Sequence, residues 1–337
     1  MKNYSDRVLT GMRTTGSLHL GHYVGALKMW LQAQEEELDC FFLLADVQAL
    51  TTHADNPKLI SDSVREVVLD WLAVGLDPFR DNVHFVLQSG VQARFEISQY
   101  LLMIANLGEI ERNPTIKDEM RGNRNPSMGF LTYPVDQAAD VYMVSPIPGQ
   151  GRLLVPVGED QVPHLEYSRV LARRFNKTYK ANIFTSCEAM VGEVGRLVGI
   201  DGQEKMSKSK GNSIDLSDTP DEVRKKVMKM YTDPGRKKPT DPGKVEGNPL
   251  FIYFDAFASD KTEIEHYKDQ YRAGEVGDVV LKMRLIEILN DTLRPMQERR
   301  AVYENYDLMK LVSAGTLAAR DIAEGVLARM QTSMYLW

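Results

Sequence analysis

Two short stretches of the chain combine residue types that could bind a polyphosphate. The first covers residues 15–23 and reads Thr-Gly-Ser-Leu-His-Leu-Gly-His-Tyr, so that His19 and His22 lie three residues apart. At this spacing two imidazoles share one face of a helix's first turn, where unpaired N–H groups attract an anion. Gly16 and Gly21 allow the backbone to approach a ligand closely. Both histidines could therefore donate hydrogen bonds to phosphate, although a surface turn with two incidental histidines fits the short pattern almost as well.

The second stretch, residues 205–212, reads Lys-Met-Ser-Lys-Ser-Lys-Gly-Asn. Lysines act as point charges on phosphate and serine hydroxyls add donors, so such a loop can neutralise charge that develops on a polyphosphate. A solvated charge run is the simpler interpretation of this stretch alone. No segment matches the G-x-x-x-x-G-K-[ST] motif, which disfavours a P-loop ATPase.

The first half of the chain predicts alternating strands and helices that would position these stretches. Continuous apolar runs predict strands over 8–11, 41–45, 83–87 and 153–157. Helical periodicity fills the intervals and predicts helices over 21–37, 57–74, 95–107 and 161–175. Such alternation is typical of βαβ units in a parallel sheet. Ligands bind such sheets beyond the carboxyl ends of the strands, which is where residues 15–23 follow the first predicted strand.

The second half of the chain predicts helices and loops. Thr219 to Glu222 form a capping box at the start of one helix, and helical patterns recur over 279–289 and 317–334. Residues 231–249, rich in glycine, proline and lysine, predict a loop, and no strand is predicted after about residue 215. We therefore expect an α/β fold: a Rossmann-like, parallel-sheet nucleotide-binding domain over 1–215, followed by an α-helical domain over 216–337.

Composition excludes several classes of protein. The chain has 337 residues, 43% of them hydrophobic, with a net charge of −6 and two cysteines. Abundant apolar residues exclude a disordered chain, and no apolar run approaches the roughly 20 residues of a membrane span. Two cysteines make no disulfide framework or zinc site, and the histidine pair has no third metal ligand nearby. We expect a cytoplasmic enzyme without targeting segment, resident metal, membrane anchor or DNA-binding role.

Taken together, the two stretches resemble the two hallmark motifs of class I aminoacyl-tRNA synthetases. Four further segments are similar to tryptophanyl-tRNA synthetases: residues 113–117, 132–140, 155–161 and 293–295. The resemblance covers essentially the whole chain. It implies an enzyme that activates L-tryptophan with ATP, releases pyrophosphate, and transfers tryptophan to the 3′ end of tRNA(Trp).

The resemblance also implies roles for individual residues. The catalytic groups that would contact the phosphates are His19, His22, Lys117, Lys205 and Lys208. The ATP site would be formed by Arg13, Thr14, Thr15, Gly21, His22, Gly158, Glu159, Asp160, Leu197, Lys205, Met206, Ser207, Lys208 and Ser209. ATP would enter with Mg²⁺ as a substrate complex, without a metal site made by the protein.

Tryptophan, by the same resemblance, would be bound by Asp140, Tyr133, Gln137, Gln161 and Leu9. An indole has one hydrogen-bond donor and no acceptor, so a buried carboxylate facing it selects tryptophan. Phenylalanine would leave that acid unpaired, and mismatches of this kind discriminate strongly. The amino acid's own carboxylate attacks the α-phosphorus, so the reaction needs no general base. Orientation and charge neutralisation then supply the catalysis.

Two departures from the usual family pattern leave the substrate and the activity open. Arg13-Thr14-Thr15 stands where many members have Gln-Pro-Ser, and Gln137 replaces a methionine often seen three residues before the indole-reading aspartate. Tyr133, Gln137 and Asp140 therefore also resemble the pocket of tyrosyl-tRNA synthetases, although Leu9 on the first strand suits an indole. A non-catalytic or specialised synthetase paralogue would also fit the motifs, as would an adenylyl-transferring enzyme that does not use tRNA.

A basic segment could contact tRNA despite the acidic total. Residues 221–244 contain eight basic and four acidic side chains, which would supply salt-dependent contacts to phosphates. A solvated helix face and loop explain the segment nearly as well. The resemblance implies that the helical domain recognises the anticodon and that the enzyme is a homodimer.

Overall fold

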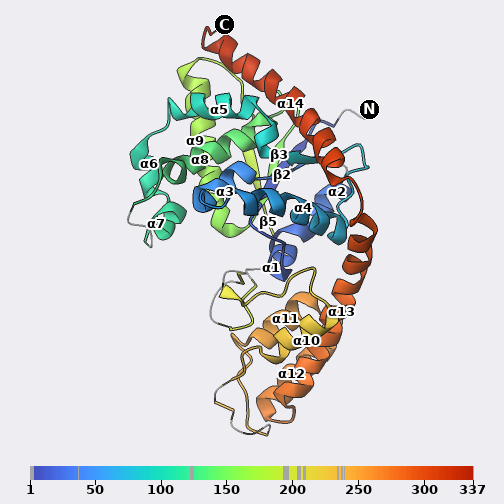
Figure 1. The fold of residues 1–337 in the computed structure, drawn as a ribbon. Helices are drawn as coiled ribbons and strands as arrows, with labels where there is room; N and C mark the ends of the chain where they lie inside the picture. Colours follow the sequence, from blue (N-terminus) through green and yellow to red (C-terminus); the bar gives the residue numbers. More distant parts are fainter. Residues whose placement is uncertain are drawn as a thin grey trace.

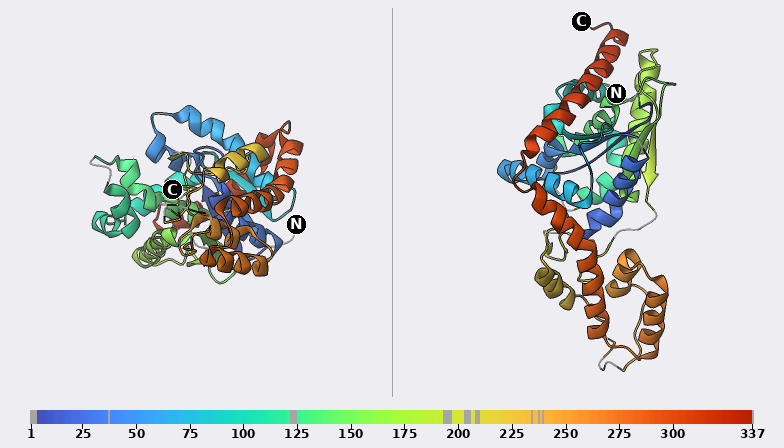
Figure 2. Two further views of the ribbon diagram at one scale, coloured as in Figure 1. Left: turned by 90° about the horizontal axis from the view of Figure 1, so that it is seen from below. Right: turned by 90° about the vertical axis from the view of Figure 1, so that its right-hand side faces the viewer.

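The computed structural model describes residues 4–36, 38–121, 125–192, 197–202, 206–207, 210–233, 235–236, 238 and 240–336. These residues form an α/β body with a helical extension below it (Figure 1). Two long helices, α13 (Asp278–Tyr303) and α14 (Leu308–Ser333), run from the extension along one side of the α/β body (Figures 1 and 2).

The sheet is parallel throughout and has β1 at its centre. The strand order is β3-β2-β1-β4-β5, and every neighbouring pair is parallel. The strands are β1 Arg7–Met12, β2 Asp39–Leu44, β3 Val83–Leu87, β4 Leu153–Val157 and β5 Cys187–Val191. Since the order reverses between β1 and β4, a ligand is expected to bind in a crevice beyond the carboxyl ends of these two strands. The expected Rossmann-like α/β fold is confirmed.

The edge strand β5 was not predicted from the sequence. Its residues read Cys-Glu-Ala-Met-Val, and only Cys187 is buried. An edge strand is shielded on one side at most, so it lacks the continuous apolar run that identified the central strands. The four predicted strands agree with the structure to within one or two residues.

Helices cover the sheet on both sides. They are α1 Leu20–His22, α2 Lys28–Glu35, α3 Asp46–His53, α4 Pro57–Val74, α5 Ala93–Leu102, α6 Leu107–Arg112, α7 Pro114–Met120, α8 Met128–Met143 and α9 Val162–Thr178. The helix predicted over 21–37 is divided by a π-helical turn, Tyr23–Leu27. The helix predicted over 95–107 ends at Leu102, and Gly108 lies inside α6 instead of ending a helix.

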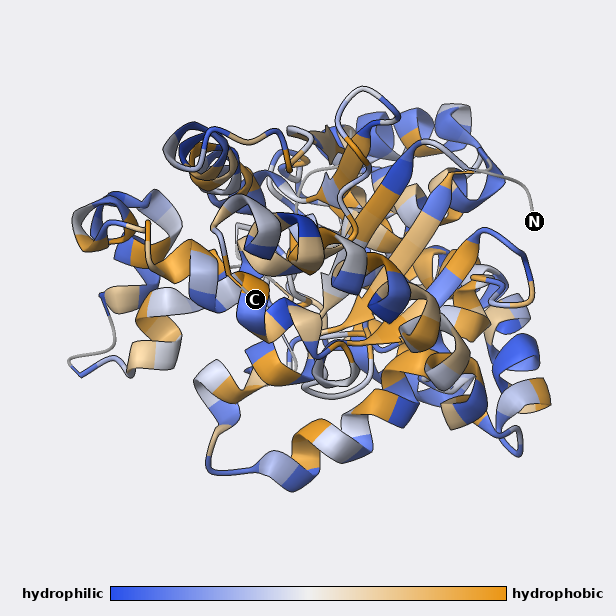
Figure 3. Cartoon of the chain, turned by 90° about the horizontal axis from the view of Figure 1, so that it is seen from above, coloured by the Kyte–Doolittle hydropathy of each residue, from blue (hydrophilic) through white to orange (hydrophobic). Residues whose placement is uncertain are grey.

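Alternate strand residues enter two hydrophobic clusters, one on each face of the sheet. Phe42 and Phe85 pack with Trp30 and Trp71 beneath α2 and α4, and the rings of Trp30 and Phe42 stack with centroids 5.0 Å apart. The opposite face packs against α5, α8 and α9 and includes Leu9, Phe41, Leu43 and Val155. Apolar segments accordingly gather around the sheet in Figure 3.

The helical extension contains α10 Pro220–Met228, α11 Pro249–Phe257, α12 Lys261–Ala273 and the first part of α13. The predicted capping box starts α10: Glu222 N–H donates to Thr219 Oγ1 at 3.3 Å, and Thr219 N–H donates to Glu222 Oε2 at 2.8 Å. Helix α13 is longer than predicted because it continues through Pro295.

The last helix, α14, packs on the α/β body rather than on the extension. It lies along the edge strand β3, where Leu87 N–H donates to Thr316 Oγ1 at 2.9 Å. A Cβ atom on Gly315 would lie 2.4 Å from the backbone oxygen of Phe85, so the close approach requires glycine. Although α14 falls within the predicted domain 216–337, it therefore covers a free sheet edge of the other domain. The boundary at residue 215 remains a prediction.

Candidate active site

The first histidine motif forms the turn between β1 and α1, at the carboxyl end of the central strand. The rings of His19 and His22 stack with centroids 3.8 Å apart, so the two imidazoles lie side by side as their spacing predicts. His22 Nδ1 accepts a 3.2 Å hydrogen bond from the His19 backbone N–H. A neutral His22 therefore carries its proton on Nε2, the nitrogen that can donate to a phosphate oxygen.

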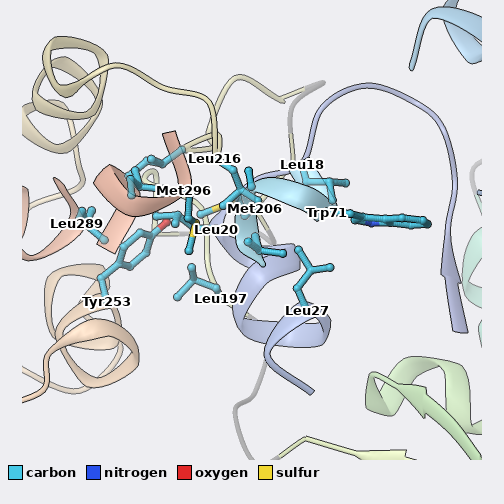
Figure 4. Packing of buried hydrophobic residues seen from close by; sticks show 14 of the residues in the cluster. Leu18, Leu20, Leu27, Trp71, Leu197, Met206, Leu216, Tyr253, Leu289 and Met296 are labelled. Atoms are coloured by element: carbon cyan, nitrogen blue, oxygen red, sulfur yellow. The ribbon is translucent and has the colours of Figure 1, made fainter. Parts of the chain in front are cut away.

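The structure brings the second motif against the first. Gly21 N–H donates to Sδ of Met206 at 3.4 Å, and Leu20 N–H donates to the carbonyl of Ile214 at 2.9 Å. Leu20, Leu197 and Met206 pack together between the α/β body and the extension (Figure 4). The chain that enters and leaves the lysine-rich loop is thus attached to the histidine turn.

Part of the lysine-rich motif lies outside the described residues, namely Lys205, Lys208 and Ser209. Of the remainder, Met206 is buried and Ser207 N–H donates to Asn212 Oδ1 at 2.7 Å. Asn212 Nδ2 in turn donates to Asp201 Oδ2 at 2.8 Å. These bonds hold the base of the loop.

A buried aspartate connects the histidine turn to the helix that carries the extension. Asp70 on α4 is completely buried. It accepts a 2.6 Å bond from Leu18 N–H, one residue before His19. It also forms a 2.5 Å ion pair with Arg300 on α13. Because no motif marked Asp70, sequence reasoning missed it.

The turn after β4 supplies the other wall of the crevice. Gly158, Glu159 and Asp160 follow β4 directly, the last two within a 3₁₀ turn over Glu159–Gln161. Thr115 Oγ1 on α7 donates to the Asp160 carbonyl at 3.0 Å. Helix α7 also carries Lys117, which is exposed. The lysine expected to bind phosphate therefore lies on a helix that is hydrogen-bonded to this turn.

Residues 13–15 lie between β1 and the histidine turn. Arg13 Nη1 donates to Thr52 Oγ1 of α3 at 3.3 Å, and Thr15 N–H donates to the Arg13 carbonyl at 3.0 Å. Thr14 is completely buried, and its hydroxyl has no hydrogen-bond partner among the described residues. An unpaired buried hydroxyl at this place is consistent with a polar ligand in the crevice.

Asp140 on α8 lies at the centre of a buried polar network. Its carboxylate accepts from Arg94 Nε at 2.6 Å and from Gln88 Nε2 at 2.7 Å. Arg94 also pairs with Asp136 at 2.5 Å. Burial raises the pKa of Asp140, whereas the charge of Arg94 and the hydrogen bonds from Gln88 and Arg94 act in the opposite direction. The two donors fix the carboxylate rigidly, and each oxygen retains a lone pair for one more donor.

The sequence interpretation named Asp140 but missed Gln88 and Arg94. Gln88 directly follows β3, so the rule that ligand-binding residues follow the carboxyl ends of parallel strands could have identified it. Arg94 gave no comparable signal, because an arginine in an amphipathic helix is normally solvated, whereas Arg94 is completely buried.

A chain of hydrogen bonds runs through the pocket from Asn113 to Glu119. The Tyr133 hydroxyl donates to Glu119 Oε2 at 2.9 Å and lies 3.1 Å from His164 Nε2. Asn113 Nδ2 lies 3.4 Å from His164 Nδ1, which must therefore accept, leaving the His164 proton on Nε2 to face Tyr133. Burial together with Glu119 raises the pKa of Tyr133, so its hydroxyl stays protonated.

Two glutamines complete the pocket wall. Gln137 Nε2 donates to Gln161 Oε1 at 3.4 Å, and Gln161 Nε2 donates to Asp160 Oδ2 at 3.3 Å. Gln137 Oε1 is buried and has no hydrogen-bond partner among the described residues. Leu9 belongs to the same hydrophobic cluster as Tyr133. These bonds join α8 to the turn after β4, while Leu9 and Tyr133 share one hydrophobic cluster; that all five residues bind tryptophan stays a prediction.

The buried His164 predicts a specific dependence of stability on pH. Burial lowers its pKa from 6.5 to about 4. Between these values the unfolded chain binds a proton there and the folded chain does not, so stability falls as pH decreases. From pH 7 to pH 4, we expect the wild type to lose about 3 kcal/mol more unfolding free energy than His164→Gln. Urea denaturation checks this. The control, His266→Gln at an exposed position, should lose as much unfolding free energy as the wild type. Equal losses by wild type and His164→Gln would show that His164 does not cause the pH dependence.

Fewer basic side chains of the segment 221–244 are available to bind a partner than its composition predicts. Lys226 pairs with Asp218 at 2.6 Å. Arg236 is almost fully buried and pairs with Asp278 at 3.4 Å, and Lys237 lies outside the described residues. Basic side chains that remain exposed are Arg224, Lys225, Lys229, Lys238 and Lys244.

Comparison with known proteins identifies the arrangement. The family model of tRNA synthetases class I (W and Y) matches residues 1–294. The chain belongs to this class I synthetase family. Similar proteins include the tryptophan–tRNA ligases of Streptococcus pyogenes, 44% identical over 97% of both chains, and of Clostridium longisporum, 42% identical over 97% of this chain and 96% of that one.

Solved synthetase structures share the fold over nearly the whole chain. The tryptophanyl-tRNA synthetase of Campylobacter jejuni, complexed with ADP and tryptophan, superposes with a TM-score of 0.82, 31% identity and coverage of 98% of this chain and all of that chain. A tyrosyl-tRNA synthetase from Archaeoglobus fulgidus has a TM-score of 0.67 at 23% identity, covering 88% of this chain and 90% of that one, which shows a common fold alone. The described part of this synthetase contains no helix long and apolar enough to cross a membrane.

Proposed function

We propose that this synthetase is a tryptophan–tRNA ligase, which activates L-tryptophan with ATP and then esterifies the 3′ end of tRNA(Trp). The observation that carries the substrate assignment is the buried Asp140 carboxylate, fixed by Arg94 and Gln88. Relatives that are 42–44% identical and bear the name tryptophan–tRNA ligase support the same substrate. The tyrosine-specific alternative, suggested by Tyr133, Gln137 and Asp140, is not favoured.

Asp140 would accept the indole N–H, and Leu9 would contact the apolar ring. The α-ammonium group would be bound by Tyr133 and Gln161, and the unpartnered Oε1 of Gln137 offers a further acceptor. A site with these groups selects a ligand that carries both an indole donor and an ammonium donor. Buried acceptors left unpaired by a smaller amino acid would oppose its binding.

In the activation step, a tryptophan carboxylate oxygen attacks the α-phosphorus of ATP. A new C(=O)–O–P bond forms as the bond between the α-phosphorus and its bridging oxygen breaks, and pyrophosphate leaves with the bonding electron pair. Among described residues, His19 and His22 at the start of α1, and Lys117, would stabilise the charge on the phosphates. Lys205 and Lys208 would neutralise the leaving pyrophosphate. No proton transfer is required at this step.

ATP would lie across the crevice between the histidine turn and the turn after β4. Gly158, Glu159 and Asp160 would hold the ribose and adenine side, with Leu197 against the base. Residues 13–15, Gly21, Met206, Ser207 and Ser209 would line the rest of the nucleotide. Among the described residues no three His, Cys, Asp or Glu side chains cluster suitably for a metal ion. Mg²⁺ would be held by the phosphate oxygens of ATP and would enter the site as part of the substrate.

The remaining assignments concern partners and location. The five exposed basic side chains on and after α10 would contact tRNA phosphates, with the anticodon read by the helical extension. Exposed apolar side chains at Met103, Leu107 and Met128, all on the α5–α8 side of the α/β body, suit a homodimer contact. We expect the enzyme to act in the cytoplasm.

ATP–pyrophosphate exchange tests the proposed function directly. The purified protein should catalyse exchange that depends on tryptophan and is absent with tyrosine at equal concentration. Subsequent acylation should require tRNA(Trp). Exchange with tyrosine alone would identify the protein as a tyrosyl-tRNA synthetase instead. A folded, ATP-binding protein that is silent with both amino acids would instead be a non-catalytic paralogue.

A further inference from the structure

A cavity lies at the amino end of the central strand, at the opposite end of this strand from the proposed ATP site. Its volume is about 320 Å³, and it is bounded by the start of β1, the loop after α8, and α14. Because β1 runs from Arg7 toward the histidine turn, Arg7 and this cavity lie at the amino end of the strand. The polar and charged lining includes Tyr4, Ser5, Arg7, Ser145, Asp321 and Arg329.

Arg7 provides one cationic wall of the cavity. Its Nη1 donates to the carbonyls of Val144 and Ser145, at 3.1 and 3.4 Å. Its carboxylate neighbour, Asp39, is 3.7 Å from Nε, which is too far for a hydrogen bond. Arg7 Nε is buried and lacks a hydrogen-bond partner among the described residues. The guanidinium is thus fixed by two carbonyls and by an ion pair with Asp39.

Arg329 on α14 provides the second cationic wall. Its Nε is also buried without a hydrogen-bond partner, and no described carboxylate forms an ion pair with it. Burial lowers the pKa of Arg329 and of Arg7; the charge of Asp39 raises the pKa of Arg7, and the charge of Arg329 lowers it. Two partly desolvated like charges therefore line one cavity, an arrangement that is costly unless an anion joins them.

We propose that this cavity binds a small oxyanion between Arg7 and Arg329. A guanidinium presents parallel N–H groups that match the oxygens of a phosphate or a carboxylate. The cavity has room for a small molecule that carries such a group. Asp321 also lines the cavity, but it is solvent-exposed and its repulsion is screened by water. Bound anion would bridge the first residue of the central strand to the last helix.

Isothermal titration with inorganic phosphate at constant ionic strength tests this proposal, with acetate in a parallel arm to distinguish phosphate from carboxylate chemistry. Arg329→Gln should weaken binding of the preferred anion about 10- to 100-fold, because a charge-assisted hydrogen bond is lost. Arg320→Gln removes the same charge from an exposed position on the same helix. This control should bind like the wild type. Phosphate can also bind at the proposed ATP site, but neither substitution should change its affinity there.

Thermal unfolding provides a second readout that does not depend on activity. Without phosphate or acetate, Arg329→Gln should melt at or above the wild-type temperature, because it removes an unpaired charge that repels Arg7. With saturating anion, the wild type should gain stability and the variant should not. Gln150→Glu, at the exposed rim, should also weaken binding by placing a carboxylate beside the arginines. Equal anion binding by wild type and Arg329→Gln, or no anion binding beyond the ATP crevice, would overturn the proposal.

Discussion

Asp140→Ala is expected to lower kcat/KM for tryptophan in pyrophosphate exchange by about 10²- to 10⁴-fold, corresponding to about 3–5 kcal/mol of lost transition-state binding. The substitution removes the acceptor proposed for the indole and leaves Arg94 without its 2.6 Å partner. The KM for ATP should change little, because the role proposed for Asp140 is to bind the amino acid and not the nucleotide. Steady-state exchange with each substrate varied in turn measures both effects.

Asp136→Asn separates recognition from simple loss of the ion-pair network. Asp136 is the second carboxylate partner of Arg94, and its side chain is 26% exposed. Its replacement should cost less stability and leave tryptophan recognition almost intact. Equal losses of tryptophan kcat/KM in Asp136→Asn and Asp140→Ala would mean that Asp140 acts only by neutralising Arg94.

The second large effect is expected at Asp70, which holds the backbone next to His19. Asp70→Asn should lower the unfolding free energy by about 3 kcal/mol and raise the KM for ATP, because it weakens the bonds from Leu18 N–H and Arg300. Leu18 immediately precedes His19, so a looser turn would misplace the phosphate-binding imidazole. Urea denaturation and ATP-dependent exchange rates measure the two effects.

Glu66→Gln is the matched control for Asp70. Glu66 pairs with the same Arg300 at 2.5 Å, but its side chain is 41% exposed. Exposed pairs contribute about 0–1 kcal/mol, so this variant should remain close to the wild type in both assays. If Asp70→Asn were no more damaging than Glu66→Gln, the anchoring of the histidine turn by Asp70 would be wrong.

The sequence predicted the parts of the fold that depend on local periodicity. The buried central strands carry continuous apolar runs, and helix α4 has an asparagine cap, a proline at its first position and a glycine at its end, so their boundaries were nearly correct. Strand β5 and helix α6 lack these signals, whereas α7 has the asparagine cap and the first-position proline but is only seven residues long, too short to show helical periodicity. The packing of α14 on β3 depends on contacts between residues more than 220 positions apart, which no local pattern reveals.

The candidate site divides in the same manner. His19, His22 and Asp140 belong to motifs with fixed spacing, so sequence was sufficient to name them. The roles of Arg94, Gln88 and Asp70 arise from burial and from partners on other elements, which sequence alone does not specify. In the basic segment the sequence overestimated the number of side chains available to tRNA, because Lys226 and Arg236 form ion pairs within the fold.

The position of α14 has a consequence for the order in which the protein is completed during synthesis. The β3 edge is covered by residues from 308 onward, which are translated more than 200 residues after β3 itself. A nascent chain that has already made the histidine turn, both crevice walls and the lysine-rich loop therefore still exposes an uncovered strand edge, which invites pairing with other chains. A protein ending near residue 300 would retain every proposed catalytic residue and yet be prone to aggregation, so the integrity of the catalytic half depends on a helix that is translated long after it.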